Sequence, residues 1–189
     1  MTVTTLDPKA ALVVIDLQKG VVAMPTVPHA PTDVVARTAA LADAFRAHDL
    51  PVVLVRVTFA GDGADAVPGR TEAGRRPAPP AGWDEIVDDL TGDVVVTKRN
   101  WSAFYGTDLD LQLRRRGVTQ IVLTGVATSI GVESTARAAY EHGYHVTLAT
   151  DAMADATEES HRHSVDRIFP RLGETGTSAE IIDLLEKTR

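Results

Sequence analysis

The sequence contains no cysteine among its 189 residues. A chain without cysteine forms no disulfide bond, binds no metal through thiolate and makes no covalent intermediate through a thiol. Aromatic residues are also scarce, at 5% of the chain. A domain of this length can still bury a sizeable core without covalent cross-links. Any nucleophilic chemistry in this chain therefore has to proceed without a thiol.

The sequence also lacks an excess of positive charge and long apolar runs. Its 19 Lys and Arg residues face 26 Asp and Glu residues, which gives a net charge of −7. This balance argues against nucleic acid or an anionic membrane surface as a partner. No apolar run approaches the roughly 18 residues that a membrane-spanning helix needs. The glycine-rich motifs for dinucleotides and for P-loop phosphate binding are missing as well. We therefore expect a cytoplasmic protein that uses no nucleotide cofactor.

Apolar, β-branched runs alternate with helical patterns along the chain. The expected strands cover residues 11–17, 51–57, 93–97, 118–123 and 145–150, with an edge strand at 173–177. The expected helices cover residues 32–48, 83–90, 107–117, 130–140, 157–169 and 177–187. Residues 151–155 are expected to form a connecting loop. This alternation is typical of an α/β fold with a parallel sheet and right-handed crossovers. Since no internal repeat interrupts it, we expect one domain spanning residues 1–189.

Residues 118–140 form the strand–turn–helix unit around which the chain is organised. The apolar strand at 118–123 ends near Gly125, and a helical pattern follows as far as Tyr140. In an open parallel sheet, ligands bind beyond the carboxyl ends of the strands. Free N–H groups at the start of a helix favour developing negative charge there. An acyl-transfer enzyme would place its nucleophile in this turn, and here that position is Gly131.

Two charged residues lie at the ends of expected strands. Asp16 interrupts the apolar run of the first strand, where a half-desolvated carboxylate is costly unless it is paired or used. A structural Asp that caps a neighbouring loop is the alternative. Lys98 follows the third strand, on the same rim as Asp16 if the sheet is parallel. A solvated strand end is the alternative for this lysine.

Two loops have features that are unusual for plain connections, three aromatic residues in one and great length in the other. Trp101, Phe104 and Tyr105 lie within five residues of one another. Three aromatic side chains in a loop either cover a pocket or become buried in a subunit interface. The loop at residues 59–82 is too long for a plain connection, which favours a lid or a binding loop. Its Gly- and Pro-rich composition is equally typical of a solvated flexible segment.

Four segments together resemble the isochorismatase-like hydrolase superfamily. They are the Asp-bearing strand V-V-I-D-L-Q, the Lys-bearing strand with its aromatic segment V-V-V-T-K-R-N-W-S-A-F-Y-G, the turn and helix L-T-G-V-A-T-S-I-G-V-E-S-T-A-R-A-A-Y-E-H-G-Y, and the loop T-D-A-M-A. The resemblance covers most of the chain, from residue 8 to residue 185. It implies a three-layer α/β/α Rossmann-like sandwich with a mostly parallel sheet of about six strands. It also implies a small-molecule substrate and a homo-oligomer, either a dimer or a tetramer.

In most members of this superfamily, a catalytic Asp, Lys and Cys meet at the carboxyl rim of the sheet. The matching positions here are Asp16, Lys98 and Gly131, so the cysteine is absent. The resemblance further implies a non-proline cis peptide bond between Val126 and Ala127. That turn would aim the N–H groups of Ala127 and Gly131 into the site as an oxyanion hole.

The pocket and the metal content follow from the same comparison. We expect the substrate pocket to be lined by Gln18, Phe59, Trp101, Phe104 and Tyr105. The nicotinamidase branch of the superfamily carries an Asp/His metal site after the second strand. Here that region reads R-V-T-F-A-G-D-G, without histidine. We therefore expect no metal and no other cofactor.

The glycine at position 131 has a precedent that points to a particular chemistry. The resemblance implies that true isochorismatases also have Gly there and cleave a vinyl ether, with the Asp as general acid on the alkene carbon. Such an acid needs a raised pKa, which burial of Asp16 would provide and Lys98 would oppose. Isochorismatases typically carry an aromatic residue in the turn, whereas this chain has Ala127. Isochorismate is therefore one candidate substrate among several.

Three functions remain open on the sequence. The first is a hydrolase that uses Asp16 and Lys98, without a covalent intermediate, on a small metabolite with a vinyl ether or an activated carbonyl. The second is an amidohydrolase in which Ser129 or Ser134 replaces the thiol, although both lie off the Gly131 position. The third is a catalytically silent member that binds a small metabolite or a partner.

Overall fold

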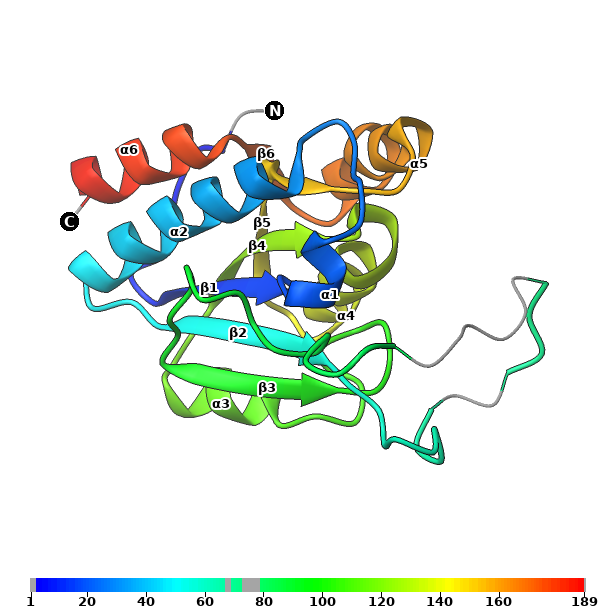
Figure 1. Ribbon diagram of the computed structural model, residues 1–189. Helices are drawn as coiled ribbons and strands as arrows, with labels where there is room; N and C mark the ends of the chain where they lie inside the picture. Colours follow the sequence, from blue (N-terminus) through cyan, green and yellow to red (C-terminus); the bar gives the residue numbers. More distant parts are fainter. Residues whose placement is uncertain (1–2, 67–68, 73–78, 189) are drawn as a thin grey trace.

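The chain folds around one six-stranded sheet in which all strands run parallel (Figure 1). The computed structural model describes residues 3–66, 69–72 and 79–188. The strand order is β3-β2-β1-β4-β5-β6, so β1 and β4 lie at the centre. The strands are β1 (Ala10–Ile15), β2 (Val52–Val57), β3 (Val94–Lys98), β4 (Gln120–Val126), β5 (His145–Ala154) and β6 (Glu174–Gly176).

Helices cover both faces of this sheet, which confirms the expected three-layer α/β sandwich. Figure 1 shows α2 and α6 side by side on one face, with α3 and α4 on the other. The α-helices are α1 (Lys19–Val22), α2 (Pro31–Ala47), α3 (Leu109–Arg115), α4 (Glu133–Glu141), α5 (Glu158–His163) and α6 (Ser178–Thr188). Two π-helical turns, η1 (Thr128–Val132) and η2 (Ser164–Ile168), and the 3₁₀ turn η3 (Phe169–Arg171) complete the regular structure.

Strand β1 shows why the sheet has two cores. Its six residues are all buried, and successive side chains of a strand point to opposite faces. Leu12 and Val14 pack with α2 and α6 in one apolar cluster. Val13 and Ile15 pack with α3 and α4 in the other. A central parallel strand is apolar on both faces for this reason.

A register shift lies near the carboxyl end of β4, and β5 continues beyond it. The pairing of β4 with β5 is irregular between Leu123 and Gly125. Beyond the shift, β5 continues to Ala154, so the loop expected at residues 151–155 is wrong for most of its length. The continuation places Asp155 beside the carboxyl end of β4, because Val126 pairs with Ala154.

The helix expected at residues 83–90 does not form. The backbone groups of this segment bond outside it, since Lys19 N–H donates to Glu85 O and Gly20 N–H donates to Trp83 O. Val87 N–H donates to Leu17 O in the same way. Tertiary pairing with the segment after β1 therefore replaces the helical bonds that the local pattern favoured.

Residues 58–66, which follow β2, run outward from the sheet (Figure 1). Within the expected loop 59–82, residues 67–68 and 73–78 lie outside the described part of the chain.

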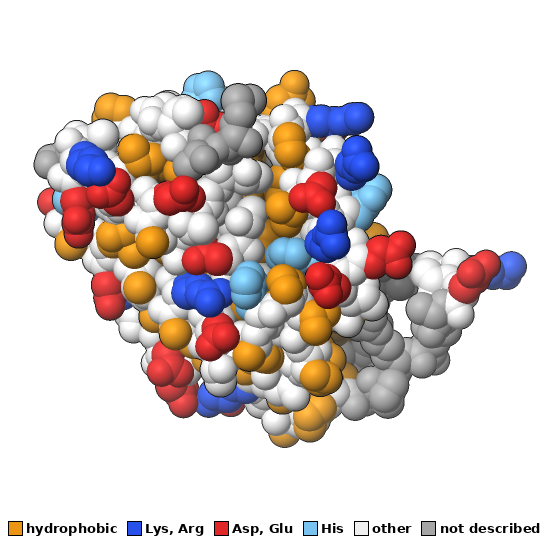
Figure 2. All heavy atoms as spheres, turned by 90° about the horizontal axis from the view of Figure 1, so that it is seen from above, with side chains coloured by type: hydrophobic (Ala, Val, Ile, Leu, Met, Phe, Trp, Pro, Cys, Tyr) orange, Lys and Arg blue, Asp and Glu red, His pale blue; other side chains and the backbone are white. Residues whose placement is uncertain are grey.

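Acidic and basic side chains are interspersed on the face shown in Figure 2. No helix among the described residues is long and apolar enough to cross a membrane.

Candidate active site

Asp16 and Lys98 form a buried ion pair at the carboxyl edge of the sheet. Asp16 directly follows β1 and Lys98 ends β3, with β2 between them. Because the three strands are parallel, their carboxyl ends meet at one edge. Lys98 Nζ lies 2.7 Å from Asp16 Oδ2, and the two side chains are 2% and 10% exposed. Lys98 Nζ also donates to Trp101 O at 2.7 Å.

The backbone of Asp16 is unusual and aims its side chain. Its φ angle is 53°, in the left-handed region that non-glycine residues seldom adopt. Asp16 N–H donates to Val55 O at 3.0 Å, and Asp16 O accepts from Gln18 N–H at 2.9 Å. Strained backbone of this kind clusters at functional sites. The bend turns the chain out of β1 while the carboxyl group stays at the strand end.

The carboxyl group of Asp16 holds its proton more tightly than an ordinary Asp. Burial raises its pKa from 3.8 to about 6, although the charge and hydrogen bond of Lys98 lower it. The second oxygen, Oδ1, is buried without a hydrogen-bond partner among the described residues. A carboxyl group with one paired oxygen and a pKa near neutrality can exchange a proton with a bound molecule.

Gly131 faces this ion pair. A Cβ atom at Gly131 would lie 3.2 Å from both Asp16 Oδ2 and Lys98 Nζ, and 2.9 Å from Ile15 Cγ2. The structure thus brings together the three positions that we predicted to be catalytic. Their roles in a reaction remain predictions.

The turn between β4 and α4 carries Gly131. The peptide bond between Val126 and Ala127 is cis, as expected. Ala127 O accepts hydrogen bonds from Ile130 N–H and Val132 N–H, each at 3.2 Å. The N–H group of Ala127 itself has no hydrogen-bond acceptor within the described residues. A free backbone donor at this turn is suited to bind a negatively charged oxygen.

Two of the predicted pocket residues follow neighbouring strands, Gln18 after β1 and Phe59 after β2. Gln18 is fully buried, and its side chain accepts from Val57 N–H at 2.7 Å and donates to Val57 O at 2.9 Å. These two bonds tie the chain after β1 to the end of β2. Phe59 is 37% exposed and stacks on Trp83 with ring centroids 6.3 Å apart. A role of either residue in binding substrate stays a prediction.

The three aromatic residues after Lys98 have separate environments. Trp101 and Tyr105 are 68% and 71% exposed, whereas Phe104 is buried. The Phe104 ring stacks on His142, with centroids 5.0 Å apart, and belongs to the core beneath α3 and α4. The spacing of these three aromatic residues in the sequence did not indicate which ring would be buried in the core. Of these three residues, Trp101 contacts the ion pair, through its backbone carbonyl, which accepts a hydrogen bond from Lys98 Nζ.

Sequence analysis missed a residue that connects this loop to the turn. The hydroxyl of Thr135 donates to Gly131 O at 2.7 Å and accepts from Ala103 N–H at 3.0 Å. Thr135 is buried on α4. Its position one helical turn after Gly131 was the only signal in the sequence.

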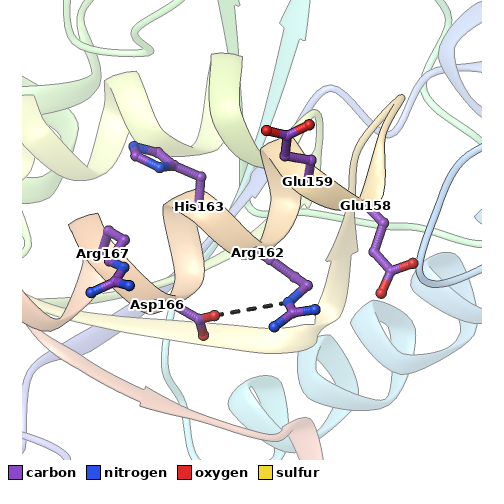
Figure 3. A pocket seen from close by; sticks show the side chains of 6 residues that line it. All are labelled: Glu158, Glu159, Arg162, His163, Asp166 and Arg167. Carbon is purple, nitrogen blue, oxygen red and sulfur yellow. Dashed lines mark ion pairs between the residues drawn. The ribbon is translucent and has the colours of Figure 1, made fainter.

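Among the residues that the structure describes, no group of three or more His, Asp or Glu side chains is arranged to hold a metal ion. Figure 3 shows a hollow on α5 and η2 whose lining includes neither Asp16 nor Lys98. It is lined by the exposed residues Glu158, Glu159, Arg162, His163, Asp166 and Arg167. Arg162 Nε and Asp166 Oδ2 are 3.9 Å apart. Exposed pairs of this kind are weak, so we interpret this surface as a solvated helix face.

Comparison with known proteins agrees with this geometry. Residues 10–180 match the isochorismatase domain family. The structure of an isochorismatase family protein from Burkholderia thailandensis shares 49% sequence identity and a TM-score of 0.92, covering 96% of this chain and 98% of that one. The uncharacterized isochorismatase family protein YwoC of Bacillus subtilis (strain 168) is 46% identical over 185 residues, 93% of either chain. A more distant structure, N-carbamoylsarcosine amidase from Thermoplasma acidophilum, shares 26% identity with a TM-score of 0.71, covering 90% of this chain and 96% of that one. The chain therefore belongs to the isochorismatase family.

Proposed function

We propose that this protein is a hydrolase that acts on a small metabolite with a vinyl ether or an activated carbonyl, without a covalent intermediate. The observation that carries the proposal is the buried Asp16–Lys98 pair, 2.7 Å apart, with Gly131 facing it. A buried ion pair with an unpaired carboxyl oxygen is costly to maintain for structure alone. In this proposal Asp16 is the proton donor and Lys98 holds it in place.

For a vinyl ether, the reaction begins with protonation of the alkene. Asp16 transfers its proton to the terminal alkene carbon, and the positive charge that forms is shared with the ether oxygen. Lys98 stabilises the carboxylate that Asp16 becomes. Water then adds to the cationic carbon and returns a proton to Asp16. The hemiketal collapses to a carbonyl compound and an alcohol, so one water is consumed and no bond to the protein forms.

For an activated carbonyl, the turn would carry more of the catalysis. The N–H group of Ala127, which has no acceptor among the described residues, would donate to the oxyanion that forms when water attacks. One such donor is worth roughly 10²–10³ in rate. Asp16 would accept a proton from the attacking water and return it to the leaving group as the oxyanion collapses, so that one water is consumed and Asp16 is restored.

Replacement of the thiol by a serine is less well supported. Among the described residues, the hydroxyl groups of Ser129 and Ser134 have no hydrogen bond to a base. A hydroxyl nucleophile needs such a base within reach. The turn supports chemistry at Gly131 without supplying a nucleophile from either serine.

The first experiment is to measure pyruvate release from isochorismate and from smaller enolpyruvyl ethers. N-carbamoyl compounds belong in the same panel because of the likeness to N-carbamoylsarcosine amidase. We expect turnover by the native chain and a loss of about 10²–10⁴ in Asp16→Asn, the range of a positioned general acid. For vinyl ethers the acid must be protonated, so their rate should fall as pH rises past about 6.

Asp151→Asn is the control, because Asp151 is a partly buried Asp whose carboxylate accepts two hydrogen bonds from Ser178 and lies 3.9 Å from Arg37 Nε, away from the Asp16–Lys98 pair. Its activity should stay close to that of the native chain. Release by the native chain no greater than that by Asp16→Asn would remove hydrolysis of vinyl ethers.

A second candidate function is binding of a small metabolite without turnover. It is favoured by the absence of a nucleophilic side chain at Gly131. Calorimetry that shows saturable binding of a panel compound, with no product formed, would support it. Amidase activity that appears only in Gly131→Cys would point the same way, since the scaffold would then be competent and the native chain silent.

A further inference from the structure

Besides Thr135, two buried side chains far along the chain, those of Asp155 and His161, are hydrogen-bonded to the turn that carries Gly131. We propose that Asp155 and His161 are positioning residues, which hold this turn from the side opposite to the ion pair and so set where its N–H groups and Gly131 lie. The inference rests on the activated-carbonyl form of the proposed function, in which an N–H group of the turn binds the oxyanion.

Asp155 is the stronger of the two anchors. Its Oδ2 accepts from Ser129 N–H at 2.6 Å, and its Oδ1 accepts from Ala156 N–H at 2.7 Å. Asp155 is only 3% exposed. Its backbone pairs in both directions with Val27, at 2.8 and 2.9 Å. The carboxylate is thus fixed by its own backbone before it binds the turn, and charged acceptors make strong hydrogen bonds.

The strand order places the two sets of side chains on different flanks of the turn. The turn follows β4, which lies between β1 and β5 in the sheet. Asp16 and Lys98 come from β1 and β3, on one side of β4. Asp155 follows β5, on the other side. A shift of the turn toward either flank would therefore change its distance to the ion pair.

His161 supplies the second anchor through Thr128. His161 Nδ1 and Thr128 Oγ1 are 2.9 Å apart, and both residues are buried. Burial, aided by the neighbouring His29, lowers the pKa of His161. A neutral imidazole can share a hydrogen bond with a hydroxyl group without bringing a charge into the turn.

The two anchors act on consecutive residues between Ala127 and Gly131. Thr128 is held by its side chain and Ser129 by its backbone N–H. The η1 turn begins at Thr128 and carries Gly131. Groups that orient reacting groups from behind commonly set catalytic geometry to within a fraction of an ångström.

The test uses a thiol as a reporter of the electrostatic environment of the turn. Since the chain has no cysteine, Gly131→Cys introduces a single thiol. Its pKa is measured from the pH dependence of alkylation by iodoacetamide. Asp155→Ala in this background should raise the thiol pKa by about one unit, with about tenfold slower alkylation at neutral pH, because the N–H groups that favour the thiolate move away.

The sign of the shift separates positioning from simple loss of charge. Removing a nearby negative charge without moving the turn would lower the thiol pKa. Asp155→Asn removes the charge but keeps an oxygen that can accept from Ser129 N–H, so we expect its thiol pKa to lie at or slightly below that of the parent. Thr128→Val replaces the hydroxyl group that bonds to His161 with a methyl group. This variant should raise the thiol pKa less than Asp155→Ala does.

Asp151→Ala is the matched control for loss of stability. Asp151 lies on β5 and, like Asp155, accepts from a backbone N–H, that of Ser178 at 2.6 Å, but its contacts are with the start of α6 and with Arg37 on α2. This variant should leave the thiol pKa unchanged. A thiol pKa that falls or does not move in Asp155→Ala would overturn the proposal. Because the reporter needs no substrate, this result is independent of whether any vinyl ether is hydrolysed.

A second measurement applies if Gly131→Cys fails to fold, since its Cβ would lie 2.9 Å from Ile15 Cγ2. Amide hydrogen exchange is then compared in chains that keep Gly131. We expect Asp155→Ala to speed exchange of the Val132 N–H about tenfold or more, and Asp151→Ala to leave it unchanged. Equal rates in the two variants would contradict a positioning role for Asp155.

Discussion

At the scale of single residues, the chemistry of the site depends on how Asp16 is surrounded. Lys98 Nζ, 2.7 Å away, favours the carboxylate, whereas burial favours the carboxylic acid and has the larger effect on the pKa. The unpartnered Oδ1 leaves room for one more hydrogen bond. These opposing influences bring the pKa of Asp16 into the range in which its carboxyl group can both donate and accept a proton.

We predict that Asp16 makes the folded state less stable as pH rises from about 4 to about 6. Burial raises its pKa from 3.8 in a model peptide to about 6. In this window the folded state holds a proton that the unfolded chain has released, so the free energy of unfolding falls with rising pH. The whole contribution is at most about 3 kcal/mol.

Urea unfolding of the native chain and of Asp16→Asn at several pH values measures this effect. The variant has no carboxyl group to titrate, so the stability of the native chain relative to it should decrease across the window. Parallel pH dependences of the two proteins would show that the pKa of Asp16 is not raised.

At the scale of elements, the strand–turn–helix unit depends on a close approach between β4 and β1. Gly125 has a φ angle of 122° and is paired with Ile15. A Cβ atom there would lie 2.0 Å from Ile15 O. The same position marks the register shift between β4 and β5. Glycine is thus required both for the backbone conformation and for the contact.

Gly125→Ala should therefore destabilise the protein by more than about 3 kcal/mol, the combined effect of backbone strain and a backbone clash. Gly143→Ala is the matched control, because Gly143 also has positive φ, at 80°, but a Cβ there would meet nothing within 4 Å. We expect that control to lose only about 1 kcal/mol. Chemical unfolding of both variants decides the matter, and equal losses would argue against the close approach.

At the scale of the whole molecule, the loop after β3 exposes two aromatic side chains. Trp101 and Tyr105 are 68% and 71% exposed, while Phe104 between them is buried. Large aromatic side chains left in water often mark an interface between proteins. Lys98 bonds to the backbone of Trp101, so contacts of this loop could reach the ion pair.

We predict a homo-oligomer in which Trp101 is buried against a second copy of the chain. Trp101→Asp should lower the mass of the particle in sedimentation velocity, because a charge in an apolar contact is costly. Tyr140→Asp is the control, since Tyr140 is 55% exposed and belongs to α4 instead of this loop. An unchanged mass in Trp101→Asp, or a monomeric native chain, would contradict the prediction.

The sequence determined the architecture because each of its patterns is local. Alternating apolar strands and amphipathic helices predict a parallel sheet between two helical layers. Parallel strands bring their carboxyl ends to one edge, so Asp16 and Lys98 could be placed on a common rim. The resemblance to a known family added the position of Gly131 and the cis peptide bond before it.

Only the tertiary structure decided what depends on partners far apart in the chain. The ion pair needs the order β3-β2-β1, which no local pattern encodes. Residues 83–90 form no helix because their backbone bonds go to the segment after β1. Asp155 looked like part of a connecting loop until the lengthened β5 placed it beside the turn. Local sequence sets periodicity and propensity, but which buried polar groups meet is decided by packing across the sheet.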